Sequence, residues 1–477
     1  MGSIWMQTAV LPSFPSLSGT HKADIAGIGG GLAGILTAYL LHQSGADVVV
    51  LEADRVGGGQ TGRTTAKLTA QHGLKYQQLS ETLGDEAASQ YAQANLAAVQ
   101  RLKRIVQEND IRCDLRDCTS FLYAAGAPGP LEKEYAVCRD LGMDVFLTEK
   151  TELPFPVTAL GLRHQAVFHP LRLLAALTEK LTIFEHSRVL TVEGHEIRTE
   201  NGAVEAEKII FTCHMPFLNV PGYYFARQHQ ERSYVLALEG AFLPRNVYLG
   251  IEENGLSFRS WDRYLLLGGG GHRTGDNRQG GKYDALTQAA QSLWPGCRTV
   301  AAWSAQDCMP MDGVPYIGQY AESRPDWFVA TGFQKWGMSS SMVAAATLSA
   351  LALGQTPISD ASVFSPQRFH PAASAAQLST DTVCSIRGLS RRVLEPGRIP
   401  LEQLPTGHGG VVELEGEKVG AYRDESGEVH VVPLKCPHMG CQLEWNPDEK
   451  SWDCPCHGSR FDYRGRLLDG PAQTDLG

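Results

Sequence analysis

A glycine pattern after a short apolar run is the feature that most constrains how this chain folds. Residues 23–28 form the apolar run, and Gly29, Gly31 and Gly34 follow it with the spacing G-x-G-x-x-G. The first glycine permits a tight turn, the second lets the backbone approach a pyrophosphate, and the third lets a helix pack closely on the strand. Apolar residues at helical spacing follow. The sequence therefore predicts a strand, a tight turn and a helix.

A second apolar run turns this unit into a predicted dinucleotide site. Residues 48–51 are a continuous apolar run of three β-branched valines and a leucine, typical of a strand buried on both faces of a parallel sheet, and Glu52 ends it. There a carboxylate can accept hydrogen bonds from ribose hydroxyls. The N–H groups and the dipole at the helix start favour a phosphate. The fingerprint does not by itself separate FAD from NAD. We assign this part of the site to Gly29, Gly31, Leu32, Ala33, Gly34, Glu52 and Ala53.

The rest of the chain indicates several further units, because 477 residues exceed a single core at roughly 150 residues per domain. Residues 87–107 predict a long helix. Short β-rich runs and turn signals over 183–271 predict a mostly antiparallel second domain. Within and after this stretch, 209–212 and 327–332 indicate strands that return to the first sheet, with a helix over 339–353. The nucleotide domain would then be discontinuous in sequence.

Composition excludes several classes of partner and location. The chain has 42 Lys and Arg against 52 Asp and Glu, a net charge of −10, and it lacks the basic runs typical of nucleic-acid contact. Residues 1–20 lack the features of a secretory signal, and the weakly polar stretch 337–354 is too interrupted for a membrane span. We expect a soluble, cytoplasmic protein with no nucleic-acid partner and no membrane span.

Two matched loops near the C-terminus predict a metal centre. Cys436 and His438 lie in one loop, and Cys454 and His457 lie in the other. Two thiolates on one iron and two imidazoles on the other define a Rieske [2Fe–2S] centre. Zinc is the alternative for two Cys and two His. The spacing argues against zinc, because a zinc finger pairs Cys with Cys through two to four residues, whereas each loop here pairs Cys with His.

From about residue 400 onward the chain resembles Rieske domains, through the segments Cys436-Pro-His-Met-Gly-Cys441 and Cys454-Pro-Cys-His-Gly-Ser459. The resemblance implies that Cys436 and Cys454 hold one iron and that His438 and His457 hold the other. It also matches Cys441 and Cys456 to the disulfide of the respiratory-chain branch.

Two further positions bear on the reduction potential. Ser459 matches the residue whose hydroxyl hydrogen-bonds a cluster sulfur in high-potential members, and such bonds stabilise the reduced state. Phe461 stands where those members carry a tyrosine. We therefore expect a potential below that of respiratory Rieske subunits.

Residues 20–370 resemble the D-amino-acid oxidase-like superfamily of FAD-dependent oxidoreductases. The resemblance rests on residues 29–34, 57–67, 312–318 and 331–338. It implies FAD as the nucleotide, with the second segment beside the pyrophosphate and flavin and the backbone of the last near the flavin pyrimidine edge. The cofactor-binding residues added on this basis are Gly62, Arg63, Thr64, Thr65, Ala66, Val189, Gly318, Gly337 and Met338.

The resemblance also suggests catalytic candidates. His272 lies in a glycine-rich segment that such enzymes bring toward the substrate, and the alternative is a solvated loop histidine. Lys335 and its neighbour Trp336 lie in the last flavin segment; for Lys335 the alternative is an ordinary surface ion pair. Cys308 lies close to Asp312 in sequence, but the spacing is shorter than in enzymes that attach flavin to a cysteine, which argues against a covalent bond.

Taken together, the predicted fold class is α/β plus α+β: a Rossmann-like FAD-binding domain with an inserted, mostly antiparallel substrate domain, followed by a small all-β Rieske domain. The expected boundaries are an N-terminal extension at 1–22, the oxidoreductase unit at 23–370 with its substrate domain mainly at about 215–305, a linker at 371–405 and the Rieske domain at 406–477.

Three functions remain open. The first is oxidation of an amine or amino acid by hydride transfer to FAD, with electrons leaving singly through the cluster to an external acceptor. The second is an oxidase in which O₂ reoxidises FAD and the cluster is structural or regulatory. The third is an electron-transfer protein between redox partners. The expected partners are a small amine substrate and a one-electron acceptor or donor such as a ferredoxin-like protein.

Overall fold

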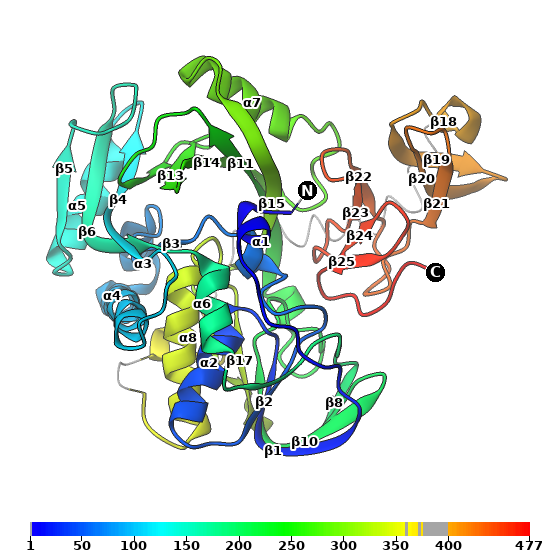
Figure 1. The fold of residues 1–477 in the computed structure, drawn as a ribbon, viewed down its shortest axis with the longest axis horizontal. Coiled ribbons are helices and arrows are strands. Elements are labelled where there is room, and N and C mark those ends of the chain that lie inside the picture. Colours follow the sequence, from blue (N-terminus) through cyan, green and yellow to red (C-terminus); the bar gives the residue numbers. More distant parts are fainter. Residues whose placement is uncertain (1, 358–360, 371–373, 375–398) are drawn as a thin grey trace.

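The computed structural model describes residues 2–357, 361–370, 374 and 399–477. Most of the linker expected at 371–405 lies outside the described residues. Figure 1 shows two large sheets, one above the other in the view, and a separate C-terminal module at their side. None of the described helices combines the length and the apolar character needed to cross a bilayer.

The first sheet is built around the predicted βαβ unit. Its order is β16-β17-β10-β1-β2-β7, and all neighbours pair in parallel except β16 with β17. The returning strands predicted at 209–212 and 327–332 are confirmed as β10 and β17, which pair with each other. The strands are β1 (Gly19–Ile28), β2 (Val48–Leu51), β7 (Thr182–Phe184), β10 (Gly202–Phe211), β16 (Tyr316–Ala321) and β17 (Arg324–Thr331), with the hairpin β8 (Thr191–Glu193) and β9 (Glu196–Arg198) attached to β10.

Both faces of this sheet are buried, as the unbroken apolar run of β2 predicts. Val48 and Val50 pack into the core on one side, and Val49 and Leu51 pack into the core on the other. Helices cover the first side, where α2 lies against α8 (Figure 1). The helices are α1 (Ile4–Thr8), α2 (Leu32–Gln43), α3 (Lys75–Leu83), α4 (Asp85–Glu108), α5 (Gly129–Asp140), α6 (Pro170–Leu177), α7 (Lys282–Leu293) and α8 (Gly337–Ala352), with short 3₁₀ turns at Gln60–Arg63, Tyr224–Ala226, Ser362–Phe364 and Leu401–Gln403.

The second sheet draws its strands from two stretches of chain. Its order is β15-β11-β14-β13-β12-β4-β6-β3, with β5 beside β6. The β-rich stretch at 183–271 is divided between the two sheets, since β7 to β10 belong to the first sheet and β11 to β14 belong to the second. Residues 67–167, which precede the range 215–305, supply four of its strands. The strands are β3 (Lys67–Leu68), β4 (Arg116–Ala124), β5 (Val145–Thr148), β6 (Thr158–Val167), β11 (Gln228–Glu239), β12 (Val247–Gly250), β13 (Ser257–Trp261), β14 (Tyr264–Arg273) and β15 (Arg298–Pro310).

The C-terminal module consists of two four-stranded sheets and agrees with the expected small all-β domain. Its core is aromatic: Trp452 and Phe461 are fully buried, and Trp452 packs against Trp445 with ring centroids 4.9 Å apart. The strands are β18 (Ile399–Pro400), β19 (Gly409–Leu414), β20 (Glu417–Arg423), β21 (Val429–Pro433), β22 (Glu444–Asn446), β23 (Ser451–Asp453), β24 (Arg460–Asp462) and β25 (Leu467–Asp469).

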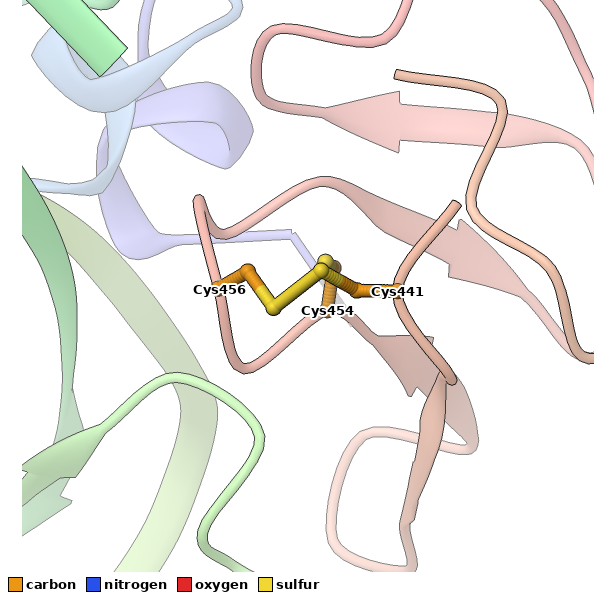
Figure 2. Close-up of side chains that lie close together, drawn as sticks. All are labelled: Cys441, Cys454 and Cys456. Atoms are coloured by element: carbon orange, nitrogen blue, oxygen red, sulfur yellow. A yellow bond between two sulfur atoms is a disulfide. The ribbon is translucent and has the colours of Figure 1, made fainter. Parts of the chain in front are cut away.

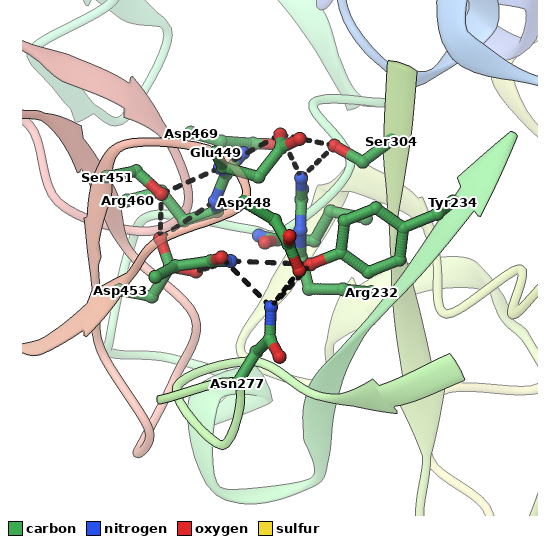
Figure 3. A network of polar contacts seen from close by, with 12 residues as sticks. Arg232, Tyr234, Asn277, Ser304, Asp448, Glu449, Ser451, Asp453, Arg460 and Asp469 are labelled. Atoms are coloured by element: carbon green, nitrogen blue, oxygen red, sulfur yellow. Dashed lines mark hydrogen bonds and ion pairs between the residues drawn. The ribbon is translucent and has the colours of Figure 1, made fainter. Parts of the chain in front are cut away.

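A buried polar network joins the module to the second sheet (Figure 3). Arg232 of β11 is fully buried, and its Nη2 donates to Glu449 Oε2 at 2.8 Å. Glu449 also accepts from Tyr283 Oη at 2.7 Å and pairs with Arg460 at 3.4 Å. Nearby, Asn277 donates to Asp448 Oδ2 at 2.8 Å. These charges are removed from water, so each depends on its partner.

We expect Arg232→Met to destabilise the protein by about 3 kcal/mol, because breaking a buried pair leaves the Glu449 carboxylate only partly compensated. The free energy of unfolding from a urea titration measures this loss. Arg298→Met is the matched control, since Arg298 pairs with Glu239 while its side chain is 74% exposed, and exposed pairs contribute at most about 1 kcal/mol. Equal losses in the two variants would contradict a special role for the buried pair.

Candidate functional site

A long cavity runs along the carboxyl ends of the first sheet. It is lined by the turn after β1, the end of β2, residues 57–64, the ends of β15 and β17, and the start of α8. Three segments of the superfamily resemblance therefore meet in one cavity although they lie far apart in sequence. Ligands of open α/β sheets bind at this edge of the strands.

The glycine turn has the geometry that its spacing predicts. Gly29 has a φ of +114°, and a Cβ there would lie 2.6 Å from the carbonyl oxygen of Thr212. A Cβ at Gly34 would lie 1.9 Å from the carbonyl oxygen of Gly29, so α2 can approach the strand only with glycine at this position. These contacts bring the first turn of α2 to the cavity wall, where its N–H groups suit a phosphate.

Glu52 lies in the cavity wall and holds the turn in place. Its Oε2 accepts from the N–H of Gly30 at 2.7 Å and its Oε1 accepts from the N–H of Asp54 at 2.9 Å. Burial raises the pKa of Glu52, and these two hydrogen bonds oppose the shift. A carboxylate oxygen has a second lone pair, so the side chain keeps acceptor capacity for a ribose hydroxyl.

Most of the cofactor-binding residues assigned from sequence lie in this wall: Gly29, Gly31, Leu32, Ala33, Glu52, Ala53, Arg63, Thr64, Val189, Gly337 and Met338. The other assigned residues, Gly34, Gly62, Thr65, Ala66 and Gly318, are not among the lining residues. Gly62 and Ala66 are buried, and the carbonyl of Thr65 accepts a hydrogen bond from Arg259. Gly318 is on β16 and packs on Pro366. The glycine turn and the Glu52 carboxylate fit the pyrophosphate and ribose of a dinucleotide such as FAD.

The N-terminal residues contact this part of the wall. Trp5 of α1 is fully buried, and its Nε1 donates to the carbonyl of Thr64 at 2.6 Å. A Cβ at Gly62 would lie 2.7 Å from Met6 Cε. The expectation of an extension at 1–22 gave no sign of this contact, because a five-residue helix has too little periodicity to be noticed in sequence.

The catalytic candidates lie in different surroundings. Lys335 lines the cavity, but its Nζ lies 3.1 Å from both Glu231 and Asp307. Burial alone would lower the pKa of Lys335, yet the two carboxylates outweigh burial and raise it. Lys335 is therefore a protonated member of an ion-pair cluster at the cavity wall.

Neither Trp336 nor His272 is among the residues that line the cavity. The Trp336 ring stacks on His72, with centroids 4.7 Å apart and an angle of 13° between the planes. His272 hydrogen-bonds Tyr234 Oη at 3.0 Å and is not among the residues that line the cavity. The structure thus gives His272 a place beside the C-terminal module.

Cys308, which the sequence places close to Asp312, lines the cavity, and burial raises the pKa of its thiol, which disfavours the nucleophilic thiolate. Sequence reasoning missed other residues of this cavity. His214 and Met215, from the loop after β10, also line it. So do Leu467, Leu468, Asp469, Gly470 and Gln473 of the C-terminal module, and Asp469 accepts a hydrogen bond from Gln60 at 2.5 Å.

The two predicted cluster loops face each other in the C-terminal module. Cys436 and Cys454 are buried free thiols. A hydrogen bond with Cys454, helped by backbone N–H groups and the Ser459 hydroxyl, lowers the pKa of Cys436 to about 7 despite burial. The rings of His438 and His457 lie perpendicular, with centroids 4.9 Å apart. The Nδ1 of His438 is buried, with no hydrogen-bond partner among the described residues. Such a nitrogen beside two thiols fits an iron ligand.

A disulfide joins Cys441 to Cys456, the pair that the resemblance implies, and both residues are buried (Figure 2). It connects the two loops directly. The Sγ atom of Cys454 lies within 4.8 Å of both disulfide sulfurs. The bond therefore holds the two ligand pairs together from beside the cluster position.

One loop of the cluster site lies directly against the flavin cavity. Gln306 lines the cavity, and its Nε2 donates to the carbonyl of Gly458 at 2.9 Å. Gly458 has a φ of +78°, and a Cβ there would lie 2.2 Å from Gln230 Cγ. A Cβ at Gly470, which also lines the cavity, would lie 2.4 Å from Ser459 Cα. A single layer of residues thus separates the two sites.

The surroundings of Ser459 predict an effect on the reduction potential. Its Oγ accepts from the N–H of Ala472 at 3.1 Å and lies close enough to Cys436 to lower that thiol's pKa. We expect Ser459→Ala to lower the midpoint potential of the centre by about 60 mV, because a lost charge-assisted hydrogen bond amounts to roughly 1.4 kcal/mol, a tenfold change. A redox titration followed by EPR measures it. Ser426→Ala, at an exposed turn, is the control, and an unchanged potential in Ser459→Ala would contradict the assignment.

Comparison with known proteins agrees with this geometry. Residues 24–351 match the family model described as FAD dependent oxidoreductase, and residues 399–477 match the Rieske [2Fe-2S] domain. A Bacillus subtilis (strain 168) protein named as a Rieske 2Fe-2S iron-sulfur protein, YhfW, is 36% identical over 494 residues, which cover 99% of this chain and 96% of that protein.

Solved structures share the fold of the larger part. Glycine oxidase from Geobacillus kaustophilus is 20% identical with a TM-score of 0.61, and the match covers 73% of this chain and 99% of that one. L-proline dehydrogenase from P. horikoshii is 14% identical with a TM-score of 0.63, over 73% of this chain and 98% of that one. The chain belongs to the FAD-dependent oxidoreductase family, with FAD in its larger part and a [2Fe–2S] cluster in a C-terminal Rieske domain.

Proposed function

We propose that the protein oxidises an amino acid and passes the electrons one at a time through its cluster to an external acceptor. The observation that carries this proposal is the shared wall: Gln306 lines the flavin cavity and hydrogen-bonds the residue after the cluster ligand His457. When bound, FAD supplies two-electron acceptance from a substrate and the cluster supplies one-electron transfer. The chain's own part is to hold the two groups close together.

A second cavity supplies a place for the substrate. It adjoins the flavin cavity at Gln334, which lines both. Apolar residues of β4 and the end of β12 form part of its wall, with His72 and Lys75 on another side. His72 is buried, and burial lowers its pKa to about 3, so this ring is neutral at working pH. A partly apolar chamber without acidic side chains among its described residues suits an amine that must lose its proton before hydride transfer.

Lys75 favours an amino acid over a simple amine. It is the one cation among the described residues that line this cavity, and no carboxylate lines it. Its Nζ donates to the carbonyl of Gly313 at 3.1 Å. Burial lowers its pKa to about 8, so the ammonium form prevails at neutral pH. A cation there attracts a carboxylate and repels a protonated amine.

An anaerobic titration tests the function directly. We expect one member of a panel of L- and D-amino acids, including glycine and proline, to bleach the flavin absorbance and then the cluster absorbance. In Cys436→Ser the flavin should still bleach, but added ferricytochrome c should reoxidise it at least tenfold more slowly, because the one-electron outlet is lost.

Cys297→Ser is the matched control, since Cys297 is a buried thiol of the second sheet's core. Hydrogen peroxide release that is equal in Cys436→Ser and the parent would instead favour an O₂-using oxidase. Failure of every amino acid and amine, with rapid reduction by a ferredoxin, would favour an electron-transfer protein without a metabolite substrate.

The role of Lys75 predicts a pH dependence. We expect Lys75→Gln to raise KM for the amino acid by about tenfold or more, the loss expected for a hydrogen bond to a charged group, with less change in kcat. In the parent, KM should rise as pH passes through about 8, because the depressed pKa means that the ammonium is lost there. Steady-state kinetics between pH 6.5 and 9.5 measure both effects.

Two controls separate this role from damage to the fold. Lys22→Gln removes an exposed cation that pairs with Glu205 and should leave KM unchanged. The decarboxylated analogue of the substrate should show the same KM in the parent and in Lys75→Gln. If both substrates weaken equally, the proposed carboxylate contact is wrong.

A further inference from the structure

The two cluster loops differ sharply in exposure. Residues 454–459 are all buried, and they lie against the flavin domain through Gly458. In the other loop, Pro437 and Met439 are exposed on either side of the half-buried ligand His438. The cluster position thus has one protein-covered side toward the flavin cavity and one side toward solvent.

A loop of the larger domain borders the solvent side. Asn219 Oδ1 lies 2.9 Å from His438 Nε2, and Phe225 packs edge-on against the His438 ring with centroids 6.0 Å apart. The neighbours of these two residues point outward: Val220 is 63% exposed and Tyr223 is 55% exposed. Met439 is 47% exposed. We call Val220, Tyr223 and Met439 the cluster patch; such large apolar side chains gathered at one place mark interaction sites more often than scattered ones do.

The charge around the cluster patch differs from that of the whole chain. The two segments that form it, residues 214–227 and 434–442, contain no Asp or Glu, whereas the chain has a net charge of −10. Lys435 of the cluster loop is exposed, while the guanidinium of Arg227 is bound to the carbonyl of Pro366 and stacks over the Tyr316 ring. A patch with a local cation and no acidic residue repels an acidic protein less than a surface of average charge on this chain does. Complementary charge of this kind orients an approaching partner more than it adds affinity.

Resting on the proposed function, we propose that the cluster patch is the docking surface for an acidic one-electron carrier protein with apolar residues around its cofactor. Electrons enter through the buried loop 454–459 and leave through the exposed loop at His438. Each docking event transfers one electron: the reduced protein is oxidised by one equivalent, and the carrier is reduced by one. Two carriers are therefore consumed for each substrate molecule oxidised.

The test uses the full holoprotein and plastocyanin, an acidic copper protein, as the probe. The parent, Val220→Glu and Met439→Glu are reduced with dithionite, without substrate, and mixed with oxidised plastocyanin in a stopped-flow instrument. We expect the rate of cluster reoxidation to fall at least tenfold in both variants at low ionic strength. Calorimetric titration of the oxidised proteins with plastocyanin should show a matching loss of affinity.

Phe242→Glu is the matched control, because Phe242 is 48% exposed in the loop after β11. The substitution adds the same charge away from the cluster. It should retain at least half of the parent rate. An unchanged rate in Val220→Glu, or an equal fall in Phe242→Glu, would overturn the proposal. A second result would also overturn it: basic cytochrome c reoxidises the cluster faster than plastocyanin does, and its rate falls by the same factor in every variant. The patch would then have no specific role in docking.

Two measurements keep the outcomes distinct. The cluster EPR spectrum of each variant shows whether the site is intact. If Met439→Glu loses its cluster, Val220→Glu still tests the proposal, because Val220 lies outside the cluster loops. Because dithionite replaces the substrate, failure of every amino acid to bleach the flavin would overturn the proposed function and leave this result standing. If a water-soluble quinone reoxidises the cluster in all variants and plastocyanin does not, the acceptor is a small molecule and the proposal of a protein partner is overturned.

Discussion

The geometry of both redox sites depends on a buried charge at the junction between the two domains. Arg232 is not exposed to solvent, and it forms an ion pair with Glu449 of the Rieske domain (Figure 3). A buried charge without its partner is costly, whereas the pair contributes little net stability compared with apolar residues. The main effect of the pair is therefore to fix the position of the Rieske domain. With Arg232 paired, the Rieske domain has one favoured orientation, and that orientation sets Gly458 against Gln230 and Gln306.

This placement explains why glycine stands at Gly458 and Gly470. Both have positive φ, and at both a Cβ would collide with an atom of the facing domain or loop. The glycine after His457 lets the ligand loop approach β11, and the second glycine lets the final segment approach Ser459 while it lines the flavin cavity. Close contact between backbones also excludes water, which strengthens the hydrogen bonds that remain there.

The parts predictable from sequence were those encoded by local geometry. The turn at Gly29, the buried run of β2 and the four cluster ligands each follow from residue type and spacing over short stretches. The contribution of β4 and β6 to the second sheet was not predictable, because β4 pairs with β12 and β6 pairs with β3 across about a hundred residues or more of sequence. The part of the cavity wall formed by residues 467–473 was not predictable either, since it depends on how one domain docks on another. His272 shows the limit of local resemblance: its glycine-rich surroundings resemble a substrate loop, yet the pairing of β14 with β11 places it beside Tyr234 and outside the residues that line the flavin cavity.

The flavin cavity has two separate contact regions, one with the second cavity and one with the cluster loop. The cavity proposed to hold the substrate meets the flavin cavity at Gln334, while the contact with the cluster loop is made at Gln306 on β15. Cys308 lies between them in sequence, and the N–H of Gln334 donates to its carbonyl at 2.9 Å. Under the proposed function, a substrate and an electron carrier can therefore occupy different surfaces at the same time. An enzyme of the proposed kind, which accepts electrons in pairs and releases them singly, needs this separation, because the substrate site would otherwise have to wait for two successive carriers to dock and leave.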